Sequence, residues 1–142
     1  DTMKIFIETH VAAPIKDVWR GFNHPDNIVR WDAAGDWHTT WVSNNLTIGG
    51  KLLQRMETTD GGEKFNVAAT YTQIEPNRLI EFRMSNGLIA DRMVCLEFIE
   101  NSTGVTVRQT CDTEANHPEI QQRSEWQAVL DRFPQHVESV GL

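Results

Sequence analysis

The N-terminal part of the chain places one strand and two short helices before any other strand, and this order narrows the choice of fold more than any other feature. Residues 4–11 are rich in β-branched and apolar side chains, which predicts a strand. An Ala-Ala-Pro segment at 12–14 ends it, because proline lacks the N–H that a strand interior needs. The apolar spacing at 15–22 predicts a short amphipathic helix, and a His-Pro-Asp start at 24–26 predicts a second helix that reaches Trp31.

Six further segments have the composition or the alternation of strands. The clearest alternation puts Ile80, Phe82 and Met84 on one face and charged residues on the other. An Asp-Gly-Gly at 60–62 and an Asn-Gly at 86–87 are turn signals between strands. The six predicted strands are 38–42, 51–57, 65–74, 79–84, 92–99 and 105–111.

The last predicted element is a long helix that begins with Asn116 as its N-cap and ends before Gly141. Pro134 lies within this helix, removes one backbone hydrogen bond and is expected to kink it near residues 130–134. Strands followed by one terminal helix predict an α+β domain, with an antiparallel sheet covered on one face by that helix. The apolar stripe of the helix consists of Trp126, Val129, Leu130, Phe133 and Val137.

The bulk properties favour a single domain over residues 1–142 and exclude several classes of function. The net charge of −7 disfavours nucleic acid and anionic membrane surfaces as partners. No apolar run is long enough to span a membrane, and no N-terminal segment has the pattern of a signal peptide. Two cysteines, Cys95 and Cys111, are too few for a disulfide framework, so we expect reduced thiols and a cytoplasmic location. No motif indicates a cofactor or a metal.

A set of short motifs recurs in a specific order and spacing from residue 4 to 138. The chain thereby resembles the START-like (SRPBCC) superfamily and, within it, the family named for the activator of heat shock protein 90 ATPase. The resemblance implies a helix-grip fold, in which a curved antiparallel sheet of about seven strands wraps around a long C-terminal helix and leaves a hydrophobic cavity. It implies no reaction, because members include ligand carriers, polyketide cyclases, hormone receptors and co-chaperone domains. The motifs are Ala13-Pro14, Val18-Trp19, His24-Pro25-Asp26, Trp31, Gly49-Gly50, Ile74-Glu75-Pro76, Arg78-Leu79, Trp126 and Leu130.

Three polar residues fall on strand faces that are otherwise apolar. Gln54 lies between apolar neighbours in its strand, and Gln109 continues an apolar face. If the last hairpin pairs residues whose numbers sum to about 203, Val94 lies opposite Gln109 and Arg92 lies opposite Cys111 on the same face. A slip by one residue would turn this whole face outward. The same pairing puts the two cysteines on opposite faces, so we expect no disulfide between them.

Buried polar groups persist where they meet a partner, water or a ligand, and a few convergent polar groups in an apolar pocket are typical of small-molecule sites. Two other interpretations stay open: Gln54 and Gln109 cap strand ends or bond each other, and Arg92 forms a surface ion pair. The residues predicted to bind a ligand are Gln54, Met56, Tyr71, Phe82, Met84, Arg92, Val94, Gln109, Trp126 and Leu130.

The loop after the second helix carries Asp32, Asp36 and His38, which could ligate a metal or act in general acid–base catalysis. Their spacing matches no metal motif, and the simpler interpretation is a solvated polar loop. Three tryptophans around this loop either stack on a flat ligand or pack beneath the loop: Trp31, Trp37 and Trp41.

Three functions remain open. The first is binding of a small hydrophobic or aromatic molecule between the sheet and the terminal helix, with no catalytic residues assigned. The second is an enzyme of the polyketide cyclase or dehydratase type, with Arg92, Tyr71 and His38 as candidates to polarise a carbonyl. The third is a co-chaperone module that binds a protein partner. The full co-chaperone of the resembled family carries an additional N-terminal domain, which this sequence does not include, so this hypothesis ranks last.

Overall fold

The computed structural model describes residues 4–85, 92–113 and 118–140. In this part of the chain, strand β1 (Lys4–Val11) leads into helices α1 (Ile15–Asn23) and α2 (Pro25–Trp31), as predicted. A run of strands and one long helix follow. These elements are β2 (Ala33–Ala34), β3 (Trp37–Asn44), β4 (Lys51–Thr58), β5 (Lys64–Glu75), β6 (Leu79–Ser85), β7 (Arg92–Asn101), β8 (Gly104–Asp112) and α3 (Glu119–Val140).

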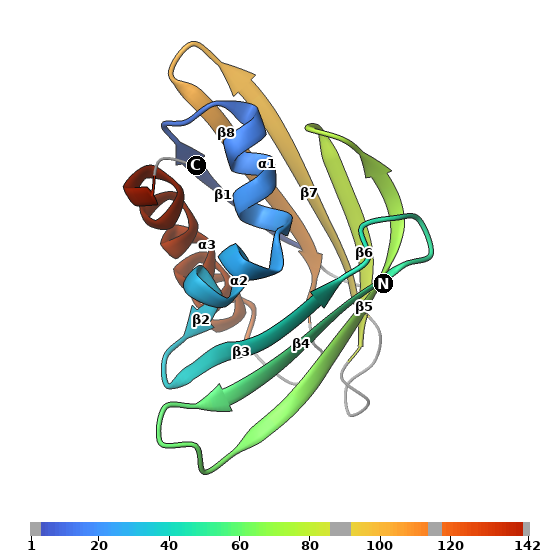
Figure 1. Cartoon of the computed structure of the whole chain (residues 1–142), viewed down its shortest axis with the longest axis vertical. Coiled ribbons are helices and arrows are strands. Elements are labelled where there is room, and N and C mark those ends of the chain that lie inside the picture. The colour runs from blue at the N-terminus through green and yellow to red at the C-terminus, as the bar shows by residue number, and fades with distance from the viewer. Residues whose placement is uncertain (1–3, 86–91, 114–117, 141–142) are drawn as a thin grey trace.

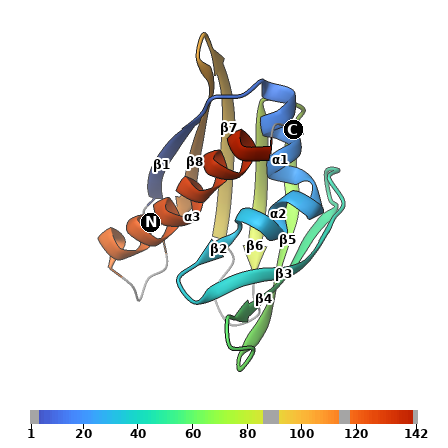
Figure 2. The ribbon, with the colours of Figure 1, turned by 60° about the vertical axis from the view of Figure 1, so that its left-hand side comes forward.

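The described strands form one antiparallel sheet in the order β1-β8-β7-β6-β5-β4-β3-β2. The sheet curls, and the three helices of the described residues lie on its concave side (Figure 1). Figure 2 shows α3 crossing in front of the end of the sheet formed by β1, β8 and β7. The seven longer strands are the seven predicted ones, and the helix-grip fold is confirmed. The two-residue β2 comes from the segment that was predicted to be a loop.

His24 explains why two short helices form where one longer helix could have run. Its backbone is extended, so it ends α1 and serves as the N-cap of α2. Its ring Nδ1 accepts a hydrogen bond from the backbone N–H of Asp26 at 3.2 Å. Pro25 follows at the first helical position, where its missing N–H costs nothing. The chain therefore changes direction at His24, and this turn brings the end of α2 beneath the sheet.

The pairing of β7 with β8 differs from the prediction by two residues. Val94 lies opposite Cys111, and Leu96 lies opposite Gln109, so the paired numbers sum to 205. The reason is that the strands extend to Asn101 and Gly104, which leaves a turn of only two residues between them. A shift of two keeps every side chain on the same face. The individual pairs were wrong, whereas the predicted faces were correct.

An aromatic cluster fills the space between α1, α2 and the second half of α3. Phe22 stacks on Trp31 with ring centroids 5.2 Å apart, and Phe133 meets both rings edge-on at 5.2 and 5.1 Å. Trp19 packs edge-on against Phe98 of β7 at 5.2 Å. This cluster forms the aromatic part of the hydrophobic core at one end of the concave face.

Polar contacts from both halves of α3 hold the helix to the neighbouring elements. Gln127 donates to the backbone oxygen of Glu8 on β1 at 3.0 Å. His136 and Asn27 of α2 share a hydrogen bond of 2.8 Å. Of the predicted apolar stripe, Leu130, Phe133 and Val137 are buried, while Trp126 and Val129 are partly buried.

Three sequence predictions about α3 and the turns have no structural outcome here. Pro134 lies inside the helix, and the kink that we expect there stays a prediction. The proposed N-cap at Asn116 and the Asn-Gly turn at 86–87 lie outside the described residues.

Candidate functional site

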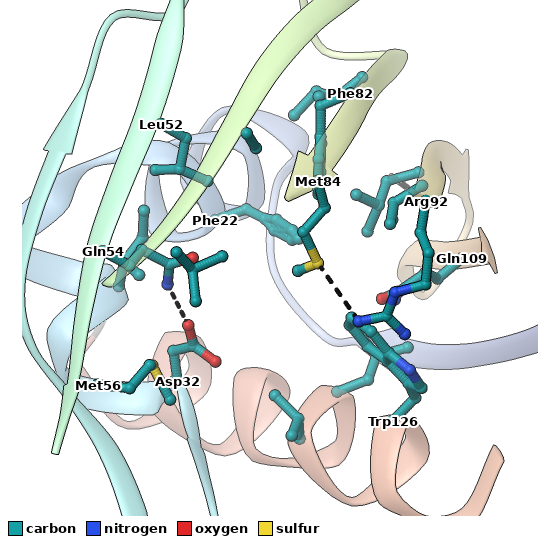
Figure 3. Close-up of a pocket in the computed structure, with 18 of the residues that line it drawn as sticks. Phe22, Asp32, Leu52, Gln54, Met56, Phe82, Met84, Arg92, Gln109 and Trp126 are labelled. Carbon is teal, nitrogen blue, oxygen red and sulfur yellow. Dashed lines mark hydrogen bonds between the residues drawn. The ribbon is translucent and has the colours of Figure 1, made fainter. Parts of the chain in front are cut away.

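A cavity of about 430 Å³ lies between the concave face of the sheet and the first half of α3 (Figure 3). Its wall is mostly apolar. All ten residues that the sequence analysis selected line it, and whether they bind a molecule stays a prediction. They are Gln54 and Met56 on β4, Tyr71 on β5, Phe82 and Met84 on β6, Arg92 and Val94 on β7, Gln109 on β8, and Trp126 and Leu130 on α3.

The two-residue period of the strands explains why these side chains share one surface. Every second residue of a strand faces the same side, so Gln54 and Met56 point inward together, as do Phe82 and Met84. Ala69 of β5 also lies on this wall, and its small side chain leaves room that a larger residue would fill. The aromatic cluster borders the cavity, because Phe22 and Trp31 also belong to its wall.

Asp32 provides the polar group at one end of the cavity. It follows α2, and its carboxylate Oδ2 accepts hydrogen bonds from Gln54 Nε2 and from Thr39 Oγ1, the latter at 3.1 Å (Figure 3). Burial raises the pKa of Asp32, and the hydrogen bonds from Gln54 and Thr39 offset this rise only in part. The prediction of a solvated polar loop was therefore wrong for this residue.

The short strand β2 is the reason that the prediction failed. It pairs with β3 and folds the chain back, so that Asp32 lies under the sheet while Asp36 remains exposed. His38 lies on β3 opposite Ala33 and does not line the cavity. Its Nδ1 is buried and has no hydrogen-bond partner among the described residues. The three residues of the loop thus do not form one cluster.

Arg92 lies at the other end of the cavity, above Trp126. The centre of its guanidinium group is 5.6 Å from the centroid of the indole ring, a cation–π distance. Its Nη2 lies 3.9 Å from the sulfur of Met84 (Figure 3). Gln109 beside it is only 6% exposed. The side chain of Gln54 donates its hydrogen bond to Asp32. The interpretation that Gln54 and Gln109 bond each other was therefore wrong.

Tyr71 contributes its ring to the wall, while its hydroxyl group is engaged elsewhere. The hydroxyl donates a hydrogen bond of 2.7 Å to Asn44 Oδ1, and Asn44 Nδ2 donates one of 2.8 Å to the backbone oxygen of Asn23. Burial raises the pKa of Tyr71 to about 12. This chain of bonds ties β5 and β3 to the end of α1. Burial, rather than the bond to Asn44, keeps the phenol protonated at neutral pH.

The three tryptophans near the loop have separate environments. Trp31 lines the cavity from the aromatic core, and its Nε1 donates to the backbone oxygen of Gly21 at 3.0 Å. Trp37 packs edge-on against Phe65 with centroids 4.9 Å apart. Trp41 is 48% exposed. Neither Trp37 nor Trp41 is part of the cavity wall.

Several lining residues were missed by the sequence analysis. Gln122 and Glu125 of α3 precede Trp126 by four residues and by one, and helical spacing would have placed Gln122 on the same face. Phe22 and Asn23 enter the wall from the end of α1, which no local pattern indicates.

Two features are absent from the described residues. No group of three or more His, Cys, Asp or Glu side chains there could hold a metal ion. In the same part of the chain, no helix is both long enough and apolar enough to cross a membrane.

Comparison with known proteins identifies the family. A family model described as Activator of Hsp90 ATPase homolog 1-like protein matches residues 12–138. No curated protein matches the sequence. A solution structure of an AHSA1-like protein from Aeromonas hydrophila is 38% identical with a TM-score of 0.89, covering 98% of this chain and 94% of that one.

Two other solved structures extend the comparison. A protein from Cytophaga hutchinsonii is 32% identical with a TM-score of 0.79, and the match covers 96% of this chain and 92% of that one. DynU16, from the dynemicin biosynthetic locus, has a TM-score of 0.75 at 19% identity, covering 96% of this chain and 47% of DynU16, and shares the fold alone. The family match over most of the sequence and the identity to the Aeromonas protein agree, and the chain belongs to the Activator of Hsp90 ATPase homolog 1-like family.

Proposed function

We propose that this protein binds a small hydrophobic or aromatic molecule in the cavity between the sheet and α3. The observation that carries the proposal is the cavity itself. Its volume of about 430 Å³ falls within the range of roughly 300–1,000 Å³ that small-molecule sites occupy. A mostly apolar wall with a few polar groups is also the usual composition of such a site.

The energetics of packing support an occupant. Protein interiors are close-packed, and each side chain that borders a void loses contacts that a filled site would provide. Here the bordering side chains include Phe82, Met84 and Trp126, which come from two strands and a helix. A molecule of matching size would restore those contacts, so binding and stability should rise together.

The wall also indicates what kind of molecule fits. Aromatic side chains present flat apolar faces, on which flat rings stack or meet edge-on. Met56 and Met84 have flexible thioether side chains that adapt to different shapes. These residues favour an aromatic or branched apolar ligand over a highly polar one.

A matched pair of variants tests the proposal. Ala69→Leu adds three carbon atoms to the cavity wall and should weaken binding of any cavity ligand by about tenfold or more. Ala68→Leu adds the same group one residue earlier, on the opposite face of β5, and should leave binding unchanged. Both variants are titrated with flavonoids, aromatic polyketides and fatty acids. Equal affinities of the two variants for every ligand that binds would contradict the proposal.

One observation favours an enzyme as the second candidate. Asp32 is a partly buried carboxyl group with a raised pKa inside the cavity, and such groups occur at catalytic sites. Under this hypothesis Asp32 takes the place of His38 as a candidate, Arg92 at the opposite end of the cavity stays one, and Tyr71 is excluded because its hydroxyl is bonded to Asn44. Turnover of an accepted substrate that survives both Asp32→Asn and Arg92→Met would remove the hypothesis.

The co-chaperone hypothesis stays third, because it comes from the description of the family and no described surface argues for it. A pulldown with the middle domain of the chaperone tests it. The cytoplasmic location also stays an expectation, and it is supported by two unpaired cysteines, of which Cys111 is buried.

A further inference from the structure

The hydrogen bonds of Asp32 distinguish its two carboxyl oxygens. Gln54 Nε2 and Thr39 Oγ1 both donate to Oδ2. Backbone bonds hold the residue in place, since its N–H donates to Ile28 at 3.0 Å and its carbonyl oxygen accepts from Thr39 at 3.1 Å. Because both side-chain donors converge on one oxygen, this oxygen has the role of the carbonyl of a carboxylic acid, and Oδ1 is left as the hydroxyl.

Oδ1 has no hydrogen-bond partner among the described residues, and Asp32 belongs to the lining of the cavity. The second oxygen of Asp32 points away from Gln54 in Figure 3. A molecule in the cavity can therefore reach Oδ1 without displacing Gln54 or Thr39. Asp32 can therefore hold the loop through Oδ2 and still contact a ligand through Oδ1.

The charged groups around Asp32 do not neutralise the negative charge that an ionised Asp32 would carry. On α2, the charge of Arg30 helps to lower the pKa of His136. On α3, Arg132 donates a hydrogen bond of 3.3 Å to the backbone oxygen of Trp31. On β3 and β4, His38 and Glu57 pair with each other in register and do not line the cavity.

Among the described residues that line the cavity, the charged groups are Arg92 and Glu125, besides Asp32 itself. Arg92 lies at the opposite end from Asp32 (Figure 3). No described cation forms an ion pair with Asp32. An isolated carboxyl group in apolar surroundings is more stable with its proton than without it.

We propose that Asp32 faces the cavity as a neutral carboxylic acid and donates its Oδ1–H to a carbonyl oxygen of the bound molecule. This inference rests on the proposed function and specifies its ligand: an apolar or aromatic molecule that carries a ketone or another neutral carbonyl group. A ligand with a carboxylate at this end is excluded, because it would bring a second acid to a site without a compensating cation.

The test uses 9-fluorenone and fluorene, two flat tricyclic molecules that differ only in a ketone against a methylene group. The measured quantity is the ratio of their dissociation constants for each protein at about pH 6, where a solvated aspartate is ionised. Changing Asp32→Leu should reduce the preference for the ketone by about fivefold, the effect of one hydrogen bond.

Asp32→Asn is the decisive variant, because an amide can direct its oxygen to Gln54 and Thr39 and its N–H into the cavity. It should keep the preference for the ketone within about twofold. Asp36→Asn changes an exposed acid of the same loop and should behave as the wild type. Loss of the preference in Asp32→Asn would overturn the inference, since it would show that a hydrogen-bond donor at this position is not what favours the ketone.

A second measurement needs no ligand. The ¹³Cγ chemical shift of Asp32, followed over pH, reports whether the acid is protonated, and we expect the protonated form at the pH of the titrations. An ionised Asp32 with tight fluorenone binding would overturn this inference and leave the proposed function intact. Absence of binding by both molecules, with Asp32 protonated, would instead count against the proposed function and remove the basis of the inference with it.

Discussion

Gln54 of β4 donates a hydrogen bond to the carboxyl group of Asp32, which lies 22 residues earlier at the end of α2. This bond joins the sheet to the turn that leads from the helices into β2 and β3. It also fixes the polar end of the cavity, because both residues line it. The same hydrogen bond therefore stabilises the loop and positions the polar group of the cavity.

Replacing Gln54 by methionine should test this pair. Gln54→Met removes the donor and keeps the length of the side chain, so the free energy of unfolding should fall by about 1 kcal/mol. The pKa of Asp32 should rise further, because the hydrogen bond from Gln54 lowers it. Urea unfolding and an NMR titration of Asp32 measure the two effects. Gln73→Met, at an exposed position of β5, is the control, and equal effects of the two variants would contradict the account.

The raised pKa of Asp32 predicts how stability depends on pH. The usual value is 3.8, and the folded protein keeps the proton to a higher pH than the unfolded chain does. Between these two pKa values the folded state binds more protons, so the contribution of Asp32 to the free energy of unfolding is lost as the pH rises.

Asp32→Asn does not titrate and should lack this loss. Its melting temperature relative to the wild type should therefore increase from about pH 4 upward and level off above the folded pKa. Thermal unfolding at a series of pH values gives the difference directly. A difference that is the same at every pH would mean that the pKa of Asp32 is not raised.

Tyr71→Phe should separate stability from binding. The variant leaves Asn44 Oδ1 without the donor that bonds it at 2.7 Å, and the cost should be about 1–3 kcal/mol of unfolding free energy. The ring that faces the cavity is unchanged, so the affinity for an apolar ligand should change by less than about twofold. A large loss of affinity in a folded variant would show that the hydroxyl group serves the ligand instead of Asn44.

Pro134→Ala should stabilise α3, because it restores a backbone N–H within a helix and removes the clash of the proline ring. We expect a higher melting temperature or slower exchange of a cavity ligand, since a locally weaker helix opens more easily. Hydrogen exchange over residues 128–138 is the direct measurement. If both the exchange and the melting temperature stay unchanged, Pro134 does not weaken the helix.

The fold could be predicted from the sequence because its signals are local. The alternation around Phe82, the turn glycines and the apolar stripe of α3 each constrain their own segment. Once the inward face of each strand and of α3 is known, the residues on these faces give the cavity wall. The β7–β8 pairing shows the limit of this reasoning. The exact partners depend on turn length, whereas the face depends only on whether the shift is even or odd.

Asp32 was misinterpreted because its environment is not local. A short polar loop usually lies in solvent. The chain here turns at His24 and again through β2, and these two turns carry a carboxyl group beneath Gln54. Only the packing of the sheet over α2 makes this burial visible. The wall contributed by Phe22 and Asn23 was missed for the same reason.

A backbone amide NMR titration tests most directly whether the cavity binds a small apolar molecule. Labelled protein is titrated to saturation with aromatic polyketides, flavonoids, fatty acids and sterols. We predict saturable shifts for at least one class, confined to residues around Gln54, Met84, Arg92, Gln109 and Trp126. Shifts that are absent for every class, or that fall only on the outer face of the sheet, would contradict this prediction.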